Sequence, residues 1–200
     1  SEGDRRSSLR IKKFINSLTQ EDFITYPSYE LYDKLRYKLS KINRVQISNI
    51  ALDSGSDACI KNIIKITSDT KSEVLSNIPS FPMYKIYCDT FNIKFKSLKY
   101  DSDLNLTIDN IIKNITKKTT LIILANPNSP YGDLKNIKEI EFLLKILKKK
   151  SIFLLIDEAY AEFASHSVIK LLKKFNNLII SRTFSKGWGA AGCRVGYTIA

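Results

Sequence analysis

Ser151-Ile-Phe-Leu-Leu-Ile-Asp-Glu-Ala-Tyr160 is a continuous apolar run that ends in two carboxylates and an aromatic residue. A strand that is apolar along its whole length is typical of a parallel sheet with helices on both faces. In open sheets of this kind, ligands bind at the carboxyl ends of the strands. The stretch therefore predicts an α/β fold with Asp157 and Tyr160 at the edge where a ligand binds.

Two further apolar runs end in polar residues that we expect at the same edge. Thr120–Leu124 leads into a turn, residues 125–132, in which two prolines and a glycine restrict the backbone and aim the amide of Asn128. Leu178–Ile180 leads into a loop of small residues and hydroxyls that contains Lys186. A lysine after a strand is usually a solvated charge, so these other segments are what give Lys186 a predicted role.

A helix that we predict over residues 57–66 begins after Ser54-Gly55-Ser56-Asp57. Free N–H groups and the helix dipole favour a phosphate there, and Ser56 and Asp57 are equally compatible with a simple N-cap. Ser185 and Arg194 add donors on either side of Lys186. An amine, space for a flat ligand and donors for a phosphate are what pyridoxal phosphate needs from a protein.

In this order and spacing, the motifs resemble the fold type I pyridoxal-phosphate aminotransferases, most closely the histidinol-phosphate aminotransferase group. The resemblance covers nearly the whole chain, through Tyr26-Pro27, Gly55-Ser56-Asp57, residues 79–84, Asn126-Pro127-Asn128, residues 157–160, residues 183–186 and residues 194–197. It implies a three-layer large domain with a mostly parallel sheet over residues 23–200. A partly mobile N-terminal segment, residues 1–22, precedes this domain, and the chain stops before a C-terminal small domain.

The resemblance also implies roles around the cofactor ring. Lys186 holds the cofactor covalently and moves the α-proton of the substrate. Asp157 faces the pyridine nitrogen, where a buried carboxylate keeps that nitrogen protonated. Asn128 and Tyr160 bond the phenolic oxygen, and Tyr84 stacks on the ring. Because a tyrosine is more often a packing residue than a ligand, only the motifs around Tyr84 and Tyr160 support these two roles.

The cofactor phosphate is held, by the same resemblance, by backbone N–H groups of Ser56 and Asp57 and by the side chains of Ser185 and Arg194. An arginine suits a dianion because its planar fork donates two hydrogen bonds. Tyr26 reaches this phosphate from the other subunit, which predicts a homodimer.

The implied activity is transfer of an amino group between an amino acid and a 2-oxo acid, with a phosphorylated amino acid or amino alcohol such as histidinol phosphate as one candidate. A decarboxylase of an amino-acid phosphate remains an alternative, because most substrate-binding residues lie outside this stretch. Ser129 and Tyr131 stand where the family usually has Asn and Thr. We expect the chain to be a piece of a longer protein, because it ends at Ala200 inside an apparent strand.

A net charge of +12 suggests a basic nucleic-acid-binding domain as a remote alternative. The clusters Lys148–Lys150 and Lys173-Lys174 fall, however, at predicted helix ends and faces, where lysine complements the dipole. They also lack interleaved aromatic residues for stacking on bases. We therefore expect no nucleic-acid partner.

The remaining composition predicts a cytoplasmic protein without a membrane or metal partner. No apolar run approaches the roughly 18 residues of a membrane span. Cys59, Cys88 and Cys193 lack metal-ligand spacing and are expected to be reduced, buried thiols, and His166 is expected at the surface.

Alternating patterns along the chain predict strands joined by crossover helices. The expected helices are residues 10–18, 29–40, 57–66, 82–91, 106–115 and 137–147, and the expected strands are residues 47–52, 73–77, 93–98, 120–124, 151–156, 178–180 and 195–200. The polar residues 1–8 are expected to be mobile.

Overall fold

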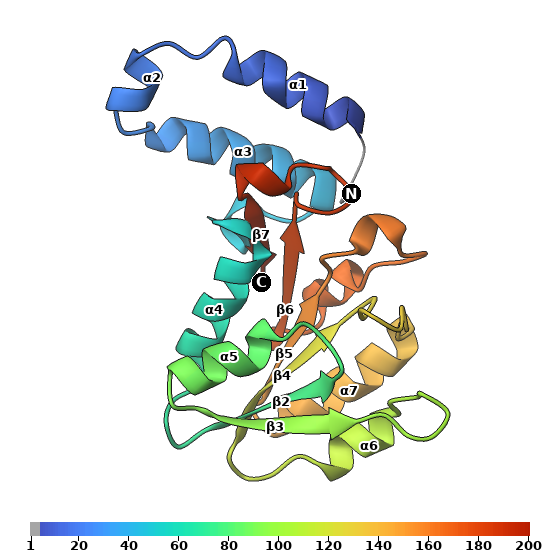
Figure 1. The fold of residues 1–200 in the computed structure, drawn as a ribbon. Helices are drawn as coiled ribbons and strands as arrows, with labels where there is room; N and C mark the ends of the chain where they lie inside the picture. Colours follow the sequence, from blue (N-terminus) through green and yellow to red (C-terminus); the bar gives the residue numbers. More distant parts are fainter. Residues whose placement is uncertain (1–4) are drawn as a thin grey trace.

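The computed structural model describes residues 5–200, which fold around one seven-stranded sheet (Figure 1). The strands lie in the order β1-β7-β6-β5-β4-β2-β3. From β6 to β3 all neighbours are parallel, and β7 is antiparallel to both β1 and β6. The strands are β1 (Ile50–Asp53), β2 (Glu73–Ile78), β3 (Lys94–Lys99), β4 (Thr119–Ala125), β5 (Phe153–Asp157), β6 (Leu178–Thr183) and β7 (Gly196–Ile199). The predicted α/β fold with a mostly parallel sheet is confirmed.

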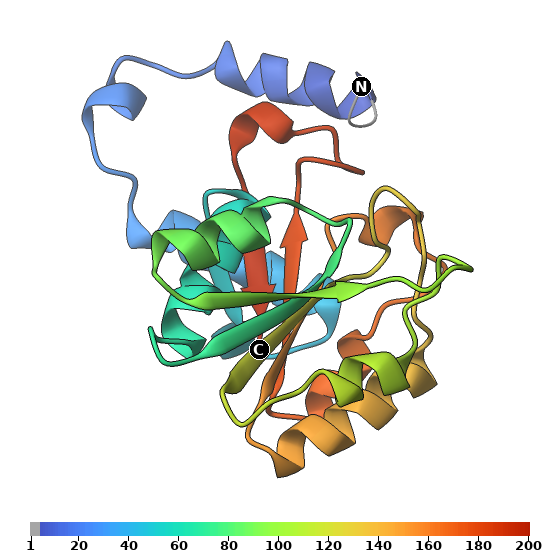
Figure 2. The same cartoon turned by 60° about the horizontal axis from the view of Figure 1, so that its bottom comes forward.

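Helices cover both faces of the sheet, which gives three layers (Figures 1 and 2). They are α1 (Arg5–Ile15), α2 (Glu21–Ile24), α3 (Tyr29–Asn43), α4 (Gly55–Thr67), α5 (Met83–Thr90), α6 (Ile108–Lys113) and α7 (Ile137–Lys149), with 3₁₀ turns η1 (Ile47–Asn49), η2 (Ala161–Phe163), η3 (Ile169–Lys173) and η4 (Ala191–Cys193). Side chains of α4 and α5 share one buried cluster with Leu121 and Ile123 of β4. Side chains of α3, α6 and α7 share the other with Ile122 and Leu124. Successive strand residues therefore serve opposite layers.

The helix α7 shows how local sequence sets an element that supports the sheet. Asn136 accepts a hydrogen bond from the backbone N–H of Glu139 at 3.0 Å, and the Glu139 side chain accepts one from the N–H of Asn136 at 2.8 Å. This reciprocal cap starts the helix. Its buried residues, Ile140, Leu143, Leu144 and Leu147, recur at helical spacing and pack on the sheet. The helix predicted over residues 137–147 is confirmed.

The N-terminal part differs from the expectation. The helix expected over residues 10–18 begins at Arg5 and ends at Ile15, because the following N–H groups of Ser17 and Leu18 bond back in tight turns. Of the expected mobile residues 1–8, residues 1–4 lie outside the described part of the chain, and residues 5–8 belong to α1. Both views place α1 and α2 away from the sheet, beyond α3 (Figures 1 and 2).

Residues 47–49 are a second difference, because they form the 3₁₀ turn η1 instead of the start of a strand. The side chain of Asn49 accepts a hydrogen bond from the N–H of Gln46 at 3.0 Å, while the N–H of Asn49 bonds the carbonyl of Gln46 at 3.0 Å. This exchange closes the turn, so β1 is delayed to Ile50. The helix expected over residues 106–115 is also shorter, since Thr107 caps α6.

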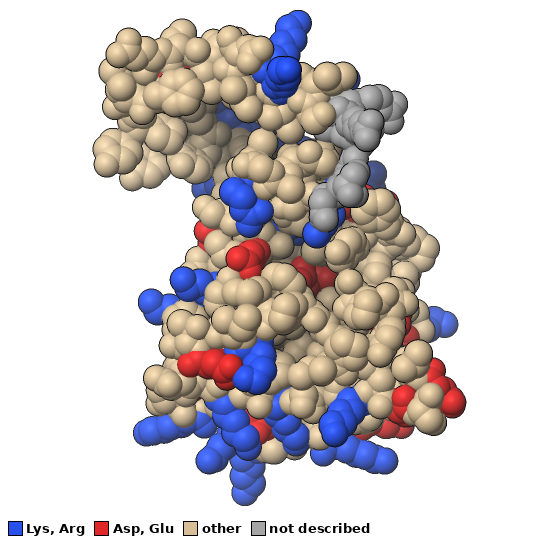
Figure 3. Space-filling model, in the orientation of Figure 1, with Lys and Arg blue, Asp and Glu red and all other residues tan. Residues whose placement is uncertain are grey.

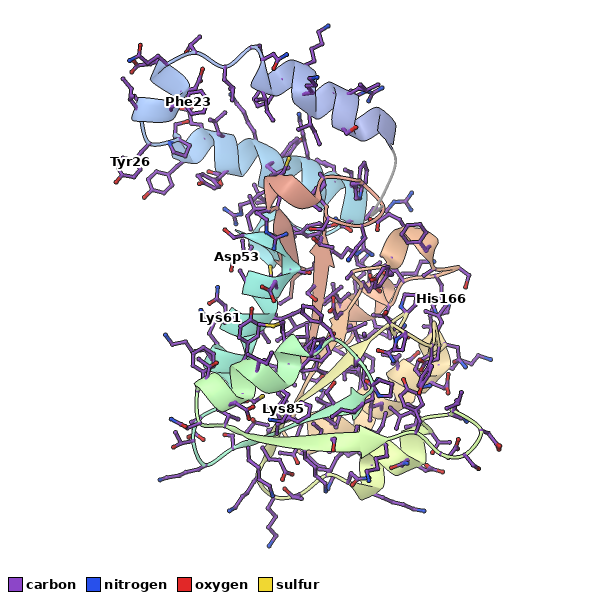
Figure 4. The ribbon with its side chains drawn as sticks, viewed as in Figure 1. Phe23, Tyr26, Asp53, Lys61, Lys85 and His166 are labelled. Carbon is purple, nitrogen blue, oxygen red and sulfur yellow. The ribbon has the colours of Figure 1, made fainter. Side chains whose placement is uncertain are left out.

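Two surface predictions are partly wrong. Cys59 and Cys88 are buried free thiols, as expected, but Cys193 is exposed because it lies in the short loop turn η4. His166 is half-buried, with Nε2 3.0 Å from the carbonyl oxygen of Lys135 (Figure 4).

Across residues 5–200, no helix has the length and apolar character of a membrane span. In the same residues, no cluster of three or more His, Cys, Asp or Glu side chains is arranged to bind a metal.

Candidate active site

A cavity of about 440 Å³ opens where the carboxyl ends of β4, β5 and β6 meet the start of α4 and the loop before α5. Parallel strands bring these ends to one edge, as the sequence predicts. Eight of the ten predicted site residues line this cavity: Ser56, Asp57, Tyr84, Asp157, Tyr160, Ser185, Lys186 and Arg194. Asn128 and Tyr26 are not among the lining residues.

Lys186 is half-buried in the loop that follows β6. Its Nζ lies 5.5 Å from the centroid of the Tyr160 ring, which comes from the end of β5. The loop is fixed on both sides of the lysine. The N–H of Ser185 donates to the Thr183 hydroxyl at 3.1 Å, and the indole of Trp188 donates to Glu162 at 2.7 Å. The amine is therefore presented to the cavity from a restrained backbone.

Asp157 is a buried carboxylate that receives hydrogen bonds from neutral donors. The hydroxyl of Tyr84 donates to Oδ2 at 2.7 Å, the hydroxyl of Ser181 to Oδ1 at 3.0 Å, and the N–H of Ala159 to Oδ1 at 3.2 Å. Burial raises the pKa of Asp157, and these hydrogen bonds oppose that shift. A cationic group in the cavity would relieve the desolvation of this carboxylate.

The start of α4 and Arg194 form a cradle for an anion. Ser54 makes no side-chain capping bond to the helix, which leaves N–H groups of the first turn to bind a ligand. Arg194 adopts a left-handed backbone conformation, with φ of 50°. Its Nη1 contacts the Ser185 hydroxyl at 3.4 Å, and a Cβ on Gly55 would lie 2.7 Å from Nη2. Glycine at position 55 therefore allows the guanidinium to lie against the helix start.

Tyr84 has only 1% of its surface exposed and makes a T-shaped ring contact with Phe81, with centroids 5.5 Å apart. Its hydroxyl bonds Asp157, so burial first and then this carboxylate raise the pKa of Tyr84 well above its ordinary value. The residue is thus both a wall of the cavity and a partner of its acid. The predicted stacking of Tyr84 on a cofactor ring stays a prediction.

Asn128 lies behind the cavity wall with its amide engaged. Its Nδ2 donates to the carbonyl of Pro79 at 3.1 Å and to the Tyr100 hydroxyl at 2.7 Å, and its Oδ1 accepts from the Ser80 hydroxyl at 2.7 Å. To bond a phenolic oxygen, this amide must exchange one of its partners. Its predicted cofactor contact therefore stays a prediction that needs a local rearrangement.

Tyr26 lies far from the cavity of its own chain, at the link between α2 and α3, and is fully exposed (Figure 4). Its predicted contact with a neighbouring subunit stays a prediction.

The sequence analysis missed two residues that contribute to the site. Ser80 lines the cavity beside Tyr84, and Ser181 bonds Asp157 from the next strand. One sequence pattern could have identified Ser181, because this residue stands in the motif that contains Lys186 and follows an apolar run.

Comparisons with known proteins agree with this geometry. The model of the family "Aminotransferase class I and II" matches residues 3–200. Histidinol-phosphate aminotransferase 1 of Carboxydothermus hydrogenoformans is 38% identical over 191 residues, which cover 95% of this chain and 53% of that protein. Histidinol-phosphate aminotransferase of Methanococcus aeolicus is 35% identical over 170 residues, 82% of this chain and 45% of that protein. The chain thus spans about half the length of the curated relatives it matches.

Solved structures show the same fold. Histidinol-phosphate aminotransferase of Sinorhizobium meliloti, in complex with pyridoxal-5'-phosphate, superimposes with a TM-score of 0.84 at 23% identity, over 100% of this chain and 53% of that one. L-threonine-O-3-phosphate decarboxylase of Porphyromonas gingivalis superimposes with a TM-score of 0.71 at 27% identity, over 84% of this chain and 49% of that one. Because the family model matches nearly every residue, this chain belongs to the class I and II aminotransferase family.

Proposed function

We propose that this chain is the cofactor-binding large domain of a pyridoxal-phosphate-dependent aminotransferase. The observation that carries the proposal is the cavity that joins Lys186, the buried Asp157 and the anion cradle at Arg194. The residues fit the cofactor chemically. A buried carboxylate suits the protonated ring nitrogen, an amine suits the aldehyde, and a helix start with an arginine suits the phosphate.

The chain's own side chains then have defined tasks. When bound, pyridoxal phosphate supplies an electron sink for the carbanion left by loss of the substrate's α-proton. Asp157 keeps a proton on the ring nitrogen through charge and proximity. The amine of Lys186 would take the proton from the α-carbon of the substrate and deliver it to the aldehyde carbon of the cofactor, which then carries the amino group. Tyr160, whose ring lies 5.5 Å from that amine, would donate a hydrogen bond from its hydroxyl to the phenolic oxygen of the cofactor, with Asn128 as the second donor.

The substrates are an amino acid and a 2-oxo acid. The relatives at 35% and 38% identity are histidinol-phosphate aminotransferases, which supports a phosphorylated amino alcohol as one substrate.

Free buried thiols at Cys59 and Cys88 support a cytoplasmic location. On the face shown in Figure 3, lysine and arginine side chains project mainly from the lower end. Lys148 and Lys149 lie in the last turn of α7, which supports a solvated role and no nucleic-acid partner.

The covalent site is tested by adding pyridoxal phosphate to the full-length protein, reducing with borohydride and mapping the labelled peptide. We expect the label on Lys186 and its loss in Lys186→Ala. Lys85→Ala is the matched control, since Lys85 is an exposed lysine paired with Asp89 on α5 (Figure 4). A label on another lysine would contradict the proposal.

Transfer and decarboxylation are separated by incubating the same protein with amino-acid phosphates and histidinol phosphate in the presence of a 2-oxo acid. Formation of a new amino acid from the 2-oxo acid supports transfer. Release of carbon dioxide without consumption of the 2-oxo acid would favour the decarboxylase, for which the likeness to the Porphyromonas gingivalis enzyme gives a specific reason.

We also propose a homodimer that shares its sites. Phe23, Tyr26 and Tyr29, near the link between α2 and α3, are 72%, 100% and 89% exposed, and aromatic side chains so exposed mark interaction surfaces. Tyr26→Phe should weaken cofactor retention by about threefold to a hundredfold, the range for one lost hydrogen bond. Tyr37→Phe, on the exposed side of α3, is the control. A fully active monomer in the ultracentrifuge would exclude the shared site.

A further inference from the structure

Ser181 stands directly opposite Asp157 on the neighbouring strand. In the parallel pairing of β5 with β6, the two residues are register partners, so their side chains lie on the same face of the sheet. Ser181 is completely buried, and its hydroxyl donates to Oδ1 of Asp157 at 3.0 Å. A buried hydroxyl needs such a partner, and here the partner is the acid of the cavity.

The donors to Asp157 differ in their position relative to the cavity. Tyr84, which bonds Oδ2, and Ala159, whose N–H bonds Oδ1, both line the cavity. Ser181 is not among the lining residues and holds the carboxylate from behind. A ligand in the cavity can replace the Tyr84 hydroxyl at Oδ2 without touching the Ser181 hydroxyl at Oδ1.

The terminal torsion of an aspartate is broad, so its carboxylate plane is set by hydrogen bonds more than by the rotamer. With Oδ1 anchored by Ser181, Oδ2 is the oxygen left to face a ligand. Supporting hydrogen bonds of this kind commonly decide whether a functional group is held in its productive geometry.

We propose that Ser181 is a positioning residue for this enzyme: it anchors one oxygen of Asp157 so that the other faces the ring nitrogen of the cofactor. The inference rests on the proposed function and adds a residue to it. It predicts that the Ser181 hydroxyl strengthens cofactor binding by orienting Asp157, and therefore only for a ligand that has a ring nitrogen to bond this carboxylate.

The test compares two ligands in the full-length protein, pyridoxal phosphate and its 1-deaza analogue, in which carbon replaces the ring nitrogen. Dissociation constants are measured by absorption titration for wild type, Ser181→Ala and Ser76→Ala. Ser76 is the matched control: it is completely buried in β2 of the same sheet, and its hydroxyl has no partner among the described residues.

We expect Ser181→Ala to weaken binding of pyridoxal phosphate by about tenfold or more, as for a lost hydrogen bond to a charged group. Binding of the 1-deaza analogue should stay unchanged, and Ser76→Ala should alter neither. In an Asp157→Asn background, Ser181→Ala should no longer discriminate between the ligands. The unchanged affinity for the analogue also shows that the variant is folded.

Equal weakening for both ligands, or no weakening for either, would overturn the positioning role while leaving the proposed function intact. Such a result with equal losses would assign Ser181 a general packing role. If wild type fails to bind pyridoxal phosphate at Lys186, the proposed function fails, and the inference fails with it.

Discussion

Asp157 is the last residue of β5 and Glu158 follows it directly, and both are almost completely buried, at 4% and 2% exposure. Because adjacent strand residues point to opposite faces, they enter different surroundings. Among the described residues, Asp157 receives hydrogen bonds from neutral donors, and it lines the cavity. Glu158 faces Arg182, with Oε2 2.9 Å from Nε and 2.7 Å from Nη2.

The partners of these two acids decide what each one can do. Glu158 is saturated, because the Ser167 hydroxyl and the N–H of Val168 also bond it, at 2.8 and 2.9 Å to Oε1. Burial lowers the pKa of Arg182, but Glu158 and Tyr197 together outweigh this and raise it above its ordinary value, so the guanidinium stays charged. The hydrogen bonds that the described residues make to Asp157 come from neutral donors, and its carboxylate lines the cavity, where a ligand can reach it. Burial alone therefore does not identify a functional acid; the kind of hydrogen-bond partner and access to the cavity separate these two.

Asp157→Ala should have the largest effect on chemistry. The full-length variant should fold and bind the cofactor at Lys186, but single-turnover amino transfer should slow by several orders of magnitude, at about 1.4 kcal/mol of barrier for each factor of ten. A residue that only caps the following turn would instead cost about 0.5–2 kcal/mol of stability and leave the rate intact. Rapid-mixing absorption measurements distinguish the two, and a near wild-type rate would refute the role of Asp157.

Glu158→Gln should have the opposite profile. It leaves Arg182 buried without its counter-charge, which should lower the free energy of unfolding by about 3–5 kcal/mol. Amino transfer per folded molecule should change little. Urea unfolding measures the loss, and the double variant Glu158→Gln with Arg182→Met should recover much of it because the unpaired charge is gone. A stable Glu158→Gln protein with impaired chemistry would reverse the assignment of the two acids.

Asp157→Asn should make the smallest but most diagnostic change, a gain in stability of the cofactor-free protein at neutral pH. The folded pKa of Asp157 is raised above its ordinary value of 3.8, so the unfolded chain loses the proton more readily. The free energy of unfolding of wild type therefore falls as the pH rises from 3.8 through the folded value.

The variant lacks this penalty and should be more stable than wild type at pH 7. The advantage should vanish below the ordinary pKa. Thermal melts across this pH range, with and without pyridoxal phosphate, give the measurement. A gain independent of pH would point to packing instead of charge.

The sequence predicted those parts of the site that depend on where elements begin and end. Lys186 and Asp157 follow apolar runs, and a parallel sheet brings such ends to one edge. The bond between Ser181 and Asp157 could not be predicted, because it depends on strand register, which no local pattern states. The same holds for the hydroxyl of Tyr100, which engages the amide of Asn128 from a segment 28 residues earlier.

The fold was predictable where apolar residues recur at a regular spacing, as in α7. It was less predictable where local hydrogen bonds favour a different structure from the one that the apolar spacing predicts. Residues 47–49 have the composition of a strand start, yet the exchange between Gln46 and Asn49 closes them into a turn. At the N-terminus, α1 lies away from the sheet (Figure 1), and its residues 8–15 are exposed or half-buried, so burial gives no periodic pattern from which to predict this helix.

The edge position of β1 affects the order in which the protein can be completed during synthesis. Within the sheet, β1 pairs with β7 alone, and the two strands are antiparallel partners from Ile50 with Ile199 to Asp53 with Gly196. A ribosome makes β1 early and β7 only after all the parallel strands. The start of α4, which follows β1 directly, packs against Gly196 of β7 and lacks this neighbour until residues 196–199 leave the exit tunnel. The anion cradle is therefore among the last parts of this domain to form on the nascent chain.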